Sequence, residues 1–208
     1  MIILEDSRLG MKASSKTFAL VQSDKKTKMA PMIKTTSFIL VMLLVFSSCQ
    51  KKDVRSDVKE KIDLLGHRNW VLLVDSAYPE QNIAGMETIL VEGDMLDNLP
   101  WFLDLLDNSP HIAPVIYKDQ ELRYLDDGMV AGIDAFKKNM DNILGERAVQ
   151  ELPHEEIFKV LDKEGGPFKV LVIKTTQVMP YTSLFFQLDC GYWNADQENA
   201  LREKISGS

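Results

Sequence analysis

Residues able to take up or release protons stand at both ends of one apolar run in this sequence. His67 and Arg68 come just before residues 70–74, and Asp75 follows that run directly. Imidazole and carboxylate groups are the usual acids and bases of enzymes, and imidazole changes its charge near neutral pH. Along an extended strand, His67 and Asp75 would lie roughly 26 Å apart at ~3.3 Å per residue. We therefore expect them to share a site only if the chain bends back or a neighbouring subunit supplies one of them.

Sequence signatures of several other kinds of site are absent. The chain has no Gly-rich dinucleotide-binding pattern, no phosphate-binding loop ending in Gly-Lys-Ser/Thr and no Gly-x-Ser-x-Gly nucleophile turn. His154 begins the segment His-Glu-Glu-Ile-Phe, which lacks the second histidine of a zinc-protease helix. With three histidines in the chain, and one cysteine after Cys49, we expect neither a transition-metal site nor a cofactor.

Apolar residues follow strand-like and helix-like spacings in turn along the chain. Apolar runs, unbroken where a strand is covered on both faces, predict strands at 70–74, 88–91, 114–117, 168–174 and 181–188. Spacings of three and four residues predict helices at 54–65, 96–106, 133–143, 153–161 and 195–205. Asp94 is the expected N-cap of the second helix, and Asn194 with Gln197 is the expected capping box of the last. This alternation predicts an α/β fold, a single domain with a mixed β-sheet flanked by helices.

Three motifs, in order, resemble the D-ribose pyranase / L-fucose mutarotase (RbsD/FucU) family of sugar-binding proteins. The first is Leu-Gly-His at 65–67, followed by the apolar run and Asp-Ser-Ala-Tyr-Pro at 75–79. The second is Pro-His-Glu-Glu-Ile-Phe at 153–158, which is similar to a histidine-containing segment of the ribose branch. The third is Pro-Tyr-Thr-Ser at 180–183. The resemblance extends over nearly all of residues 57–205.

This resemblance implies a monosaccharide mutarotase or pyranase that interconverts ring forms or anomers of a reducing sugar such as ribose or fucose. A base takes the proton of the anomeric hydroxyl while an acid protonates the ring oxygen, so the reaction needs neither metal nor nucleotide. By resemblance His67 is the acid/base, Asp75 holds a sugar hydroxyl or orients an imidazole, and Tyr181 donates a hydrogen bond from its phenol. The family also implies that His154, Ser183 and Arg68 bind substrate. It further implies a homo-oligomer with sites between subunits.

Three positions depart from the family pattern. Arg68 stands where a small or short polar residue is usual, Ser183 replaces the Asn of Pro-Tyr-x-Asn, and Gln177 replaces a Glu. The chain also continues past the usual family end, from Asp189 through a final helix. The departures at Ser183 and Arg68 favour the alternative hypothesis, a catalytically silent sugar-binding lipoprotein on the same fold. A third hypothesis is a partner-binding lipoprotein that keeps only the fold.

Each candidate residue also has a structural alternative. For His67 it is a place at a helix C-terminus, and for Asp75 it is the capping of a loop. For His154 it is an ordinary surface position, and for Tyr181 it is the core side of a strand. The three tryptophans, at 70, 101 and 193, are expected in the core rather than as sugar platforms.

A lipoprotein signal peptide is predicted in the N-terminal part of the chain. Lys34 precedes the ten-residue run 37–46, and Ser47-Ser48-Cys49 resembles a bacterial lipobox with Cys49 as lipid acceptor. The run is too short to span a bilayer as a helix, which needs about 20 apolar residues. A short anchor, or a buried helix ending in cysteine, is the alternative. We expect residues 1–48 to be removed and residues 49–56 to be a tether. Residues 57–205 would then form a sugar mutarotase domain held at the membrane, on the periplasmic or outer face of a bacterial envelope.

The charge of the mature part argues against nucleic acid as a partner. The whole chain has a formal net charge of −7, and residues 1–48 hold seven basic and three acidic side chains. The chain from Cys49 onward therefore carries a net charge of −11, which repels a polyanion unless a local basic patch overrides it. The expected partners are a monosaccharide, a membrane through the lipid at Cys49, and further copies of the chain.

Overall fold

The computed structural model describes residues 53–164 and 166–207, so the predicted signal peptide and Cys49 lie outside the described residues. No helix among these residues is long and apolar enough to cross a membrane. The elements, in chain order, are α2 (Val54–Ile62), β1 (Trp70–Val74), β2 (Met86–Leu90), α3 (Met95–Asp107), β3 (Ile112–Asp119), the 3₁₀ helix η1 (Gln120–Tyr124), α4 (Ile133–Leu144), β4 (Val149–Leu152), α5 (His154–Glu164), β5 (Val170–Lys174), β6 (Leu184–Cys190) and α6 (Ala195–Ser206).

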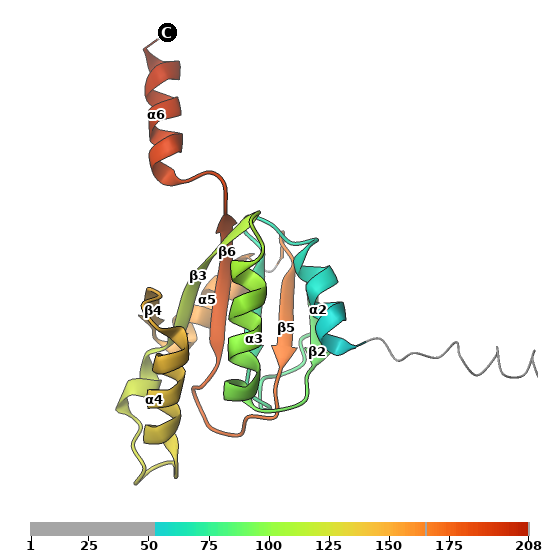
Figure 1. Ribbon diagram of the computed structural model, residues 1–208, viewed down its shortest axis with the longest axis vertical. Helices are drawn as coiled ribbons and strands as arrows, with labels where there is room; N and C mark the ends of the chain where they lie inside the picture. Colours follow the sequence, from blue (N-terminus) through green and yellow to red (C-terminus); the bar gives the residue numbers. More distant parts are fainter. Residues whose placement is uncertain (1–52, 165, 208) are drawn as a thin grey trace, which may run out of the picture. The chain divides into compact units, whose positions relative to one another are not determined.

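The six strands form one mixed sheet in the order β2-β5-β1-β6-β3-β4 (Figure 1). β1 and β2 pair with β5 in parallel, β4 pairs with β3 in parallel, and β6 runs antiparallel to both β1 and β3. Consequently β1, β3 and β5 end at one edge of the sheet, where β6 begins, and we call it the carboxyl edge. The opposite edge, where β1 begins and β6 ends, is called the amino edge. The predicted α/β fold with a mixed sheet is confirmed.

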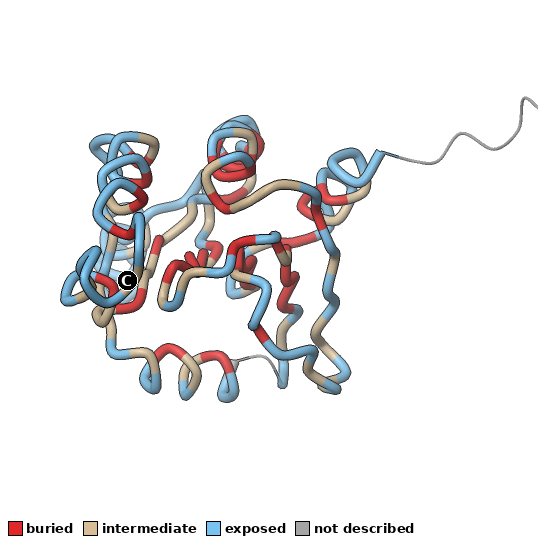
Figure 2. The backbone as a smooth tube through the Cα atoms, turned by 90° about the horizontal axis from the view of Figure 1, so that it is seen from below, coloured by how far each residue is buried: buried red, intermediate tan, exposed pale blue. Residues whose placement is uncertain are grey.

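Helices cover both faces of the sheet and make β1 a fully buried strand. Val71 and Leu73 belong to the core formed with α2, α3 and α4, whereas Trp70, Leu72 and Val74 belong to the core formed with α5. Figure 2 shows the three helices on one side of the sheet and α5 on the other. Burial on both faces explains the unbroken apolar run, since each such side chain stabilises the fold by about 1.5–3 kcal/mol relative to exposure.

Most predicted elements are confirmed, with differences at their ends. The capping boxes Asp94–Asp97 and Asn194–Gln197 both form. α2 begins at Val54, inside the stretch predicted as a tether. β3 extends two residues past its predicted end, to Asp119, and β4 and η1 were not predicted. The prediction of a strand from residue 181 was wrong, because Tyr181 has a φ of 57° and this left-handed backbone cannot continue a strand.

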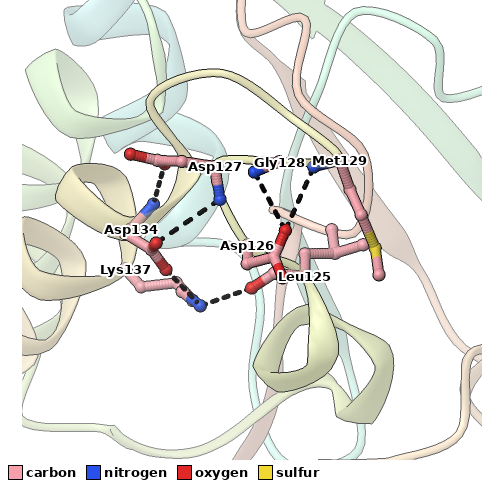
Figure 3. Close-up of polar contacts among 7 residues, drawn as sticks. All are labelled: Leu125, Asp126, Asp127, Gly128, Met129, Asp134 and Lys137. Carbon is pink, nitrogen blue, oxygen red and sulfur yellow. Dashed lines mark hydrogen bonds and ion pairs between the residues drawn. The ribbon is translucent and has the colours of Figure 1, made fainter.

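The loop between η1 and α4 is held by carboxylates (Figure 3). The N-cap of α4 is Gly132, which has no side chain to accept a hydrogen bond from the first turn of the helix. Asp127 Oδ1 instead accepts a hydrogen bond of 3.0 Å from the backbone N–H of Asp134 in that turn. Lys137 Nζ lies 2.8 Å from Asp134 Oδ1 and donates to the Leu125 carbonyl at 2.6 Å. A Cβ on Gly132 would lie 3.4 Å from the Met179 methyl, so this loop borders the turn that carries Tyr181.

The last helix leaves the sheet through a glycine that no other residue can replace without movement. A Cβ on Gly191 would lie 2.5 Å from the Pro110 carbonyl oxygen and 2.7 Å from that of Ile112. Both are backbone atoms, which cannot move aside as a side chain can. α6 then follows, and none of its residues is buried.

Candidate functional site

Asp75 and Ser183 form a hydrogen-bonded pair at the carboxyl edge, between the end of β1 and the start of β6. The Ser183 hydroxyl donates to Asp75 Oδ2 at 2.9 Å, and the Asp75 backbone N–H lies 3.2 Å from the same hydroxyl oxygen. Asp75 Oδ1 accepts from the backbone N–H of Ala77 at 2.8 Å, so the carboxylate also caps its loop, as its structural alternative predicts. The Ser183 side chain is buried, whereas Asp75 is half-buried and reaches the surface.

His154 is brought to the same edge by the first turn of α5. Its Nδ1 lies 3.0 Å from Asp119 Oδ1, and its backbone N–H donates to both carboxylate oxygens of Glu121 at 3.1 Å. Its ring meets that of Tyr181 edge to face, with centroids 5.4 Å apart and planes at 89°. It also packs on Phe158, with centroids 4.7 Å apart. The imidazole is thus held by a carboxylate and two aromatic rings, and 37% of its side chain remains exposed.

Asp119 is the buried acid of this edge, with 1% of its side chain exposed. Burial raises the pKa of Asp119 to about 6, because the charged form loses its hydration. The hydrogen bond and charge of His154 lower that pKa, whereas the negative charges of Glu121 and Asp75 raise it further. The influence of Asp75 places both carboxylates in one electrostatic environment. We call Asp75, Asp119, His154, Tyr181 and Ser183 the carboxyl-edge cluster.

Tyr181 owes its position to the turn between β5 and β6. Its positive φ turns the chain, and the buried Thr182 fixes the turn by donating from its hydroxyl to the Met179 carbonyl at 2.9 Å. Gln177, also buried, accepts a hydrogen bond of 3.1 Å from the Val178 backbone N–H. The Pro-Tyr motif therefore acts here as a shaped turn, which presents the phenol ring to His154.

His67 and Arg68 lie at the amino edge, at the other end of β1. His67 Nδ1 is 2.7 Å from Asp189 Oδ1, at the end of β6, and Arg68 Nε donates to His67 Nε2 at 3.2 Å. These three residues form the amino-edge cluster. They line a surface pocket of about 500 Å³ together with Cys190, Trp193, Asn194, Ala195 and Glu198. Trp193, expected in the core, is 41% exposed instead.

The predicted site residues therefore form two groups rather than one. Asp75, His154, Tyr181 and Ser183 come together, but β1 separates His67 and Arg68 from them within one chain. Sequence reasoning missed Asp119, Glu121 and the role of Asp189. The signal for Asp119 was its place at the carboxyl end of an apolar strand, as its last residue, whereas Asp75 directly follows β1. Among residues 53–164 and 166–207, no group of His, Cys, Asp or Glu is arranged to hold a metal ion.

Comparisons with known proteins give similarity in structure alone. No family model and no curated protein matches the sequence. Bacillus subtilis RbsD in complex with D-ribose is 21% identical over 67% of this chain and 94% of its own, with a TM-score of 0.46. The fucose mutarotase of Streptococcus pneumoniae in complex with L-fucose is 19% identical over 69% and 96%, with a TM-score of 0.45. Similarity at this level assigns no role to any residue of this chain.

Replacing Asp119 by Asn should change how stability depends on pH. A carboxyl whose pKa is about 6 when folded, against roughly 3.9 when unfolded, binds its proton more tightly in the folded state. Its stabilising contribution is therefore complete below about pH 4 and is lost as the pH rises through 6. The free energy of unfolding of the wild type, minus that of Asp119→Asn, should fall by roughly 2–3 kcal/mol across this window in urea titrations.

Glu80→Gln is the matched control for this measurement, because Glu80 is an exposed loop carboxylate. Its difference from the wild type should stay nearly constant over the same pH range. If the Asp119→Asn difference instead rose with pH, attraction to His154 would outweigh the burial of the carboxylate.

Proposed function

We propose that the protein interconverts ring forms or anomers of a reducing monosaccharide by acid–base proton transfer. The observation that carries this proposal is the carboxyl-edge cluster, in which an imidazole, a phenol and a carboxylate–hydroxyl pair converge on one edge of the sheet. The order of the Gly-His, Pro-His and Pro-Tyr motifs supports the same reaction, since it resembles the D-ribose pyranase / L-fucose mutarotase family.

The reaction requires only protons to move. A base removes the proton of the anomeric hydroxyl, the bond between the anomeric carbon and the ring oxygen breaks, and an acid protonates that oxygen. The open aldehyde then closes again on its other face or through a different hydroxyl, and both protons return. His154 turns Nδ1 to Asp119, which leaves Nε2 for a substrate proton. The pair Asp75–Ser183 and the Tyr181 phenol supply hydrogen bonds for the sugar hydroxyls.

The proposed site is completed by a second copy of the chain. His67 is the acid/base implied by the family resemblance, yet it lies at the opposite edge of the sheet from His154 and Tyr181. A neighbouring subunit that places its amino edge against this carboxyl edge supplies the missing imidazole. A homo-oligomer is therefore part of the proposal.

Removal of either histidine should slow sugar exchange by about 10²-fold, because positioned acid/base groups contribute at least that much. The variants are His67→Ala and His154→Gln, measured by saturation-transfer NMR on ribose, fucose and other reducing sugars. Tyr181→Phe should cost less, about 0.5–1.5 kcal/mol for one neutral hydrogen bond. His111→Ala is the histidine control, since His111 contacts the Ile62 carbonyl at 3.3 Å and belongs to neither cluster. Full exchange in both His67→Ala and His154→Gln would exclude the proposed chemistry.

Mixed oligomers test whether the site lies between subunits. Co-expression of His67→Ala with His154→Gln, followed by isolation through two different tags, yields mixed oligomers in which some sites keep both histidines. With random mixing, roughly one site in four keeps both histidines, and removal of the pure oligomers raises that share, so activity should recover to at least about one quarter of that of the wild type. A site within one chain would give no recovery. A monomer in analytical ultracentrifugation at micromolar concentration would also contradict the composite site.

A catalytically silent sugar-binding protein is the second candidate. The observation that favours it is the Ser183 hydroxyl, which already donates to Asp75 at 2.9 Å and is shorter than the carboxamide of the family motif. Sugar binding by calorimetry without exchange by NMR would favour this candidate, and Ser183→Asn should then strengthen binding.

We propose further that the domain is anchored to a bacterial envelope by lipid at Cys49. Mass spectrometry of the membrane fraction should find a mature chain that begins at an acylated Cys49, and Cys49→Ser should keep its N-terminal segment. Two or three acyl chains anchor a protein stably, whereas one chain binds only marginally. An unprocessed, unacylated wild-type chain would refute the anchor.

A further inference from the structure

The amino-edge cluster fixes which nitrogen of His67 carries the proton. Asp189 Oδ1 lies 2.7 Å from Nδ1, and an ionised carboxylate can only accept a hydrogen bond. Arg68 Nε donates to Nε2 at 3.2 Å, and a guanidinium can only donate. Both contacts are satisfied together only when Nδ1 bears the hydrogen and Nε2 keeps its lone pair. The geometry therefore selects the Nδ1–H tautomer over the Nε2–H tautomer.

Asp189 is itself held in place by the end of the sheet. Its Oδ1 also accepts from the backbone N–H of Cys190 at 2.7 Å, which orients the carboxylate toward His67. Two backbone hydrogen bonds join the turn that carries His67 to β6. Arg68 N–H donates to the Leu188 carbonyl at 2.8 Å, and Leu188 N–H donates to the Asn69 carbonyl at 2.9 Å. Acid and imidazole, 122 residues apart in sequence, are thus fixed by β6 rather than by flexible loops.

Arg68 occupies a backbone conformation that would suit glycine better. Its φ is 75°, in the left-handed region, where a non-glycine residue is strained by about 1 kcal/mol or more. Its guanidinium lies over the ring of Phe168, 5.8 Å from the centroid, while Nε reaches His67. The side chain therefore contacts Nε2, the ring nitrogen that Asp189 does not contact.

We propose that Asp189 is a positioning residue that holds His67 as the Nδ1–H tautomer, and that Arg68 covers Nε2 until a sugar hydroxyl replaces it. Asp189 belongs to the segment past the usual family end, so this chain supplies from its own extension the partner that orients the imidazole. The catalytic half of this inference rests on the proposed function, whereas the tautomer can be measured without any substrate.

The tautomer is tested by long-range ¹H–¹⁵N NMR on the folded, ¹⁵N-histidine-labelled protein, with the His67 signals assigned by their loss in His67→Ala. The wild type should show the Nδ1–H pattern. In Asp189→Ala the ratio of Nδ1–H to Nε2–H should fall by about five-fold, because a charge-assisted hydrogen bond at a half-exposed site is lost. Asp189→Asn, whose amide oxygen can still accept from Nδ1–H, should lie between the two. Asp196→Ala, an exposed acid in the first turn of α6, should leave the ratio unchanged. A wild-type Nε2–H pattern, or an unchanged ratio in Asp189→Ala, would overturn the assignment.

The catalytic half is tested by sugar exchange in the same variants. Asp189→Ala should lower kcat by about 10-fold with little change in KM, since a residue that orients the catalytic imidazole stabilises the transition state rather than the bound substrate. Arg68→Gly relieves the strained backbone and uncovers Nε2, so it should raise kcat, and a lowered kcat in this variant would contradict the covering role of Arg68. If Asp189→Ala shifts the tautomer but leaves kcat unchanged, the catalytic half is wrong while the proposed function stands. A wild type without exchange would contradict the proposed function, and the NMR ratio alone would then decide the role of Asp189.

Discussion

Strand β6 joins two parallel parts of the sheet, since it pairs antiparallel with β1 on one side and with β3 on the other. The polar contacts at the two ends of β1 depend on that insertion. Because β6 runs antiparallel to β1, the beginning of β6 lies beside the end of β1, where Ser183 donates a hydrogen bond to Asp75. The end of β6 lies beside the start of β1, where Asp189 is hydrogen-bonded to His67. A parallel strand in the same position would have exchanged these neighbours. One antiparallel strand therefore builds two polar sites at opposite edges of one sheet.

The two histidine–aspartate pairs have the same chemistry but different surroundings. Asp119 is buried beneath His154, so loss of hydration holds its pKa at about 6 and makes the charged state costly. Asp189 is 57% exposed, and its carboxylate keeps contact with water while it orients His67. The buried pair links proton uptake by Asp119 to the stability of the fold, whereas the proposed role of the exposed pair is to orient His67. Burial, more than the distance between the partners, separates these two effects.

Sequence reasoning succeeded where local physics determines structure. The unbroken apolar run 70–74 predicted a doubly covered strand, and the spacing of Asn194 and Gln197 predicted the last helix with its capping box. It failed where structure depends on long-range pairing. β4 is a short edge strand with a weak apolar pattern, and it was not predicted. The last residues of β3 pair with β4, so the end of β3 at Asp119 was not predicted either. The positive φ values of Arg68 and Tyr181, both non-glycine residues, left no signal in the sequence. The contact of His67 with Asp189 exists only once β6 is placed beside β1.

In the C-terminal extension, Gly191 should tolerate substitution far less than the residues of α6. The twelve residues of α6 bury no side chain, so substitutions there should change the stability of the core little. Gly191 cannot drift, because any side chain there would collide with the backbone around Ile112 and force the departing chain onto another path. Trp193 and Glu198, which line the pocket beside His67, would move with it. A single glycine thus separates a helix whose side chains can change without disturbing the core from the packed end of the sheet, so new surfaces can be brought to the amino edge without refolding the domain.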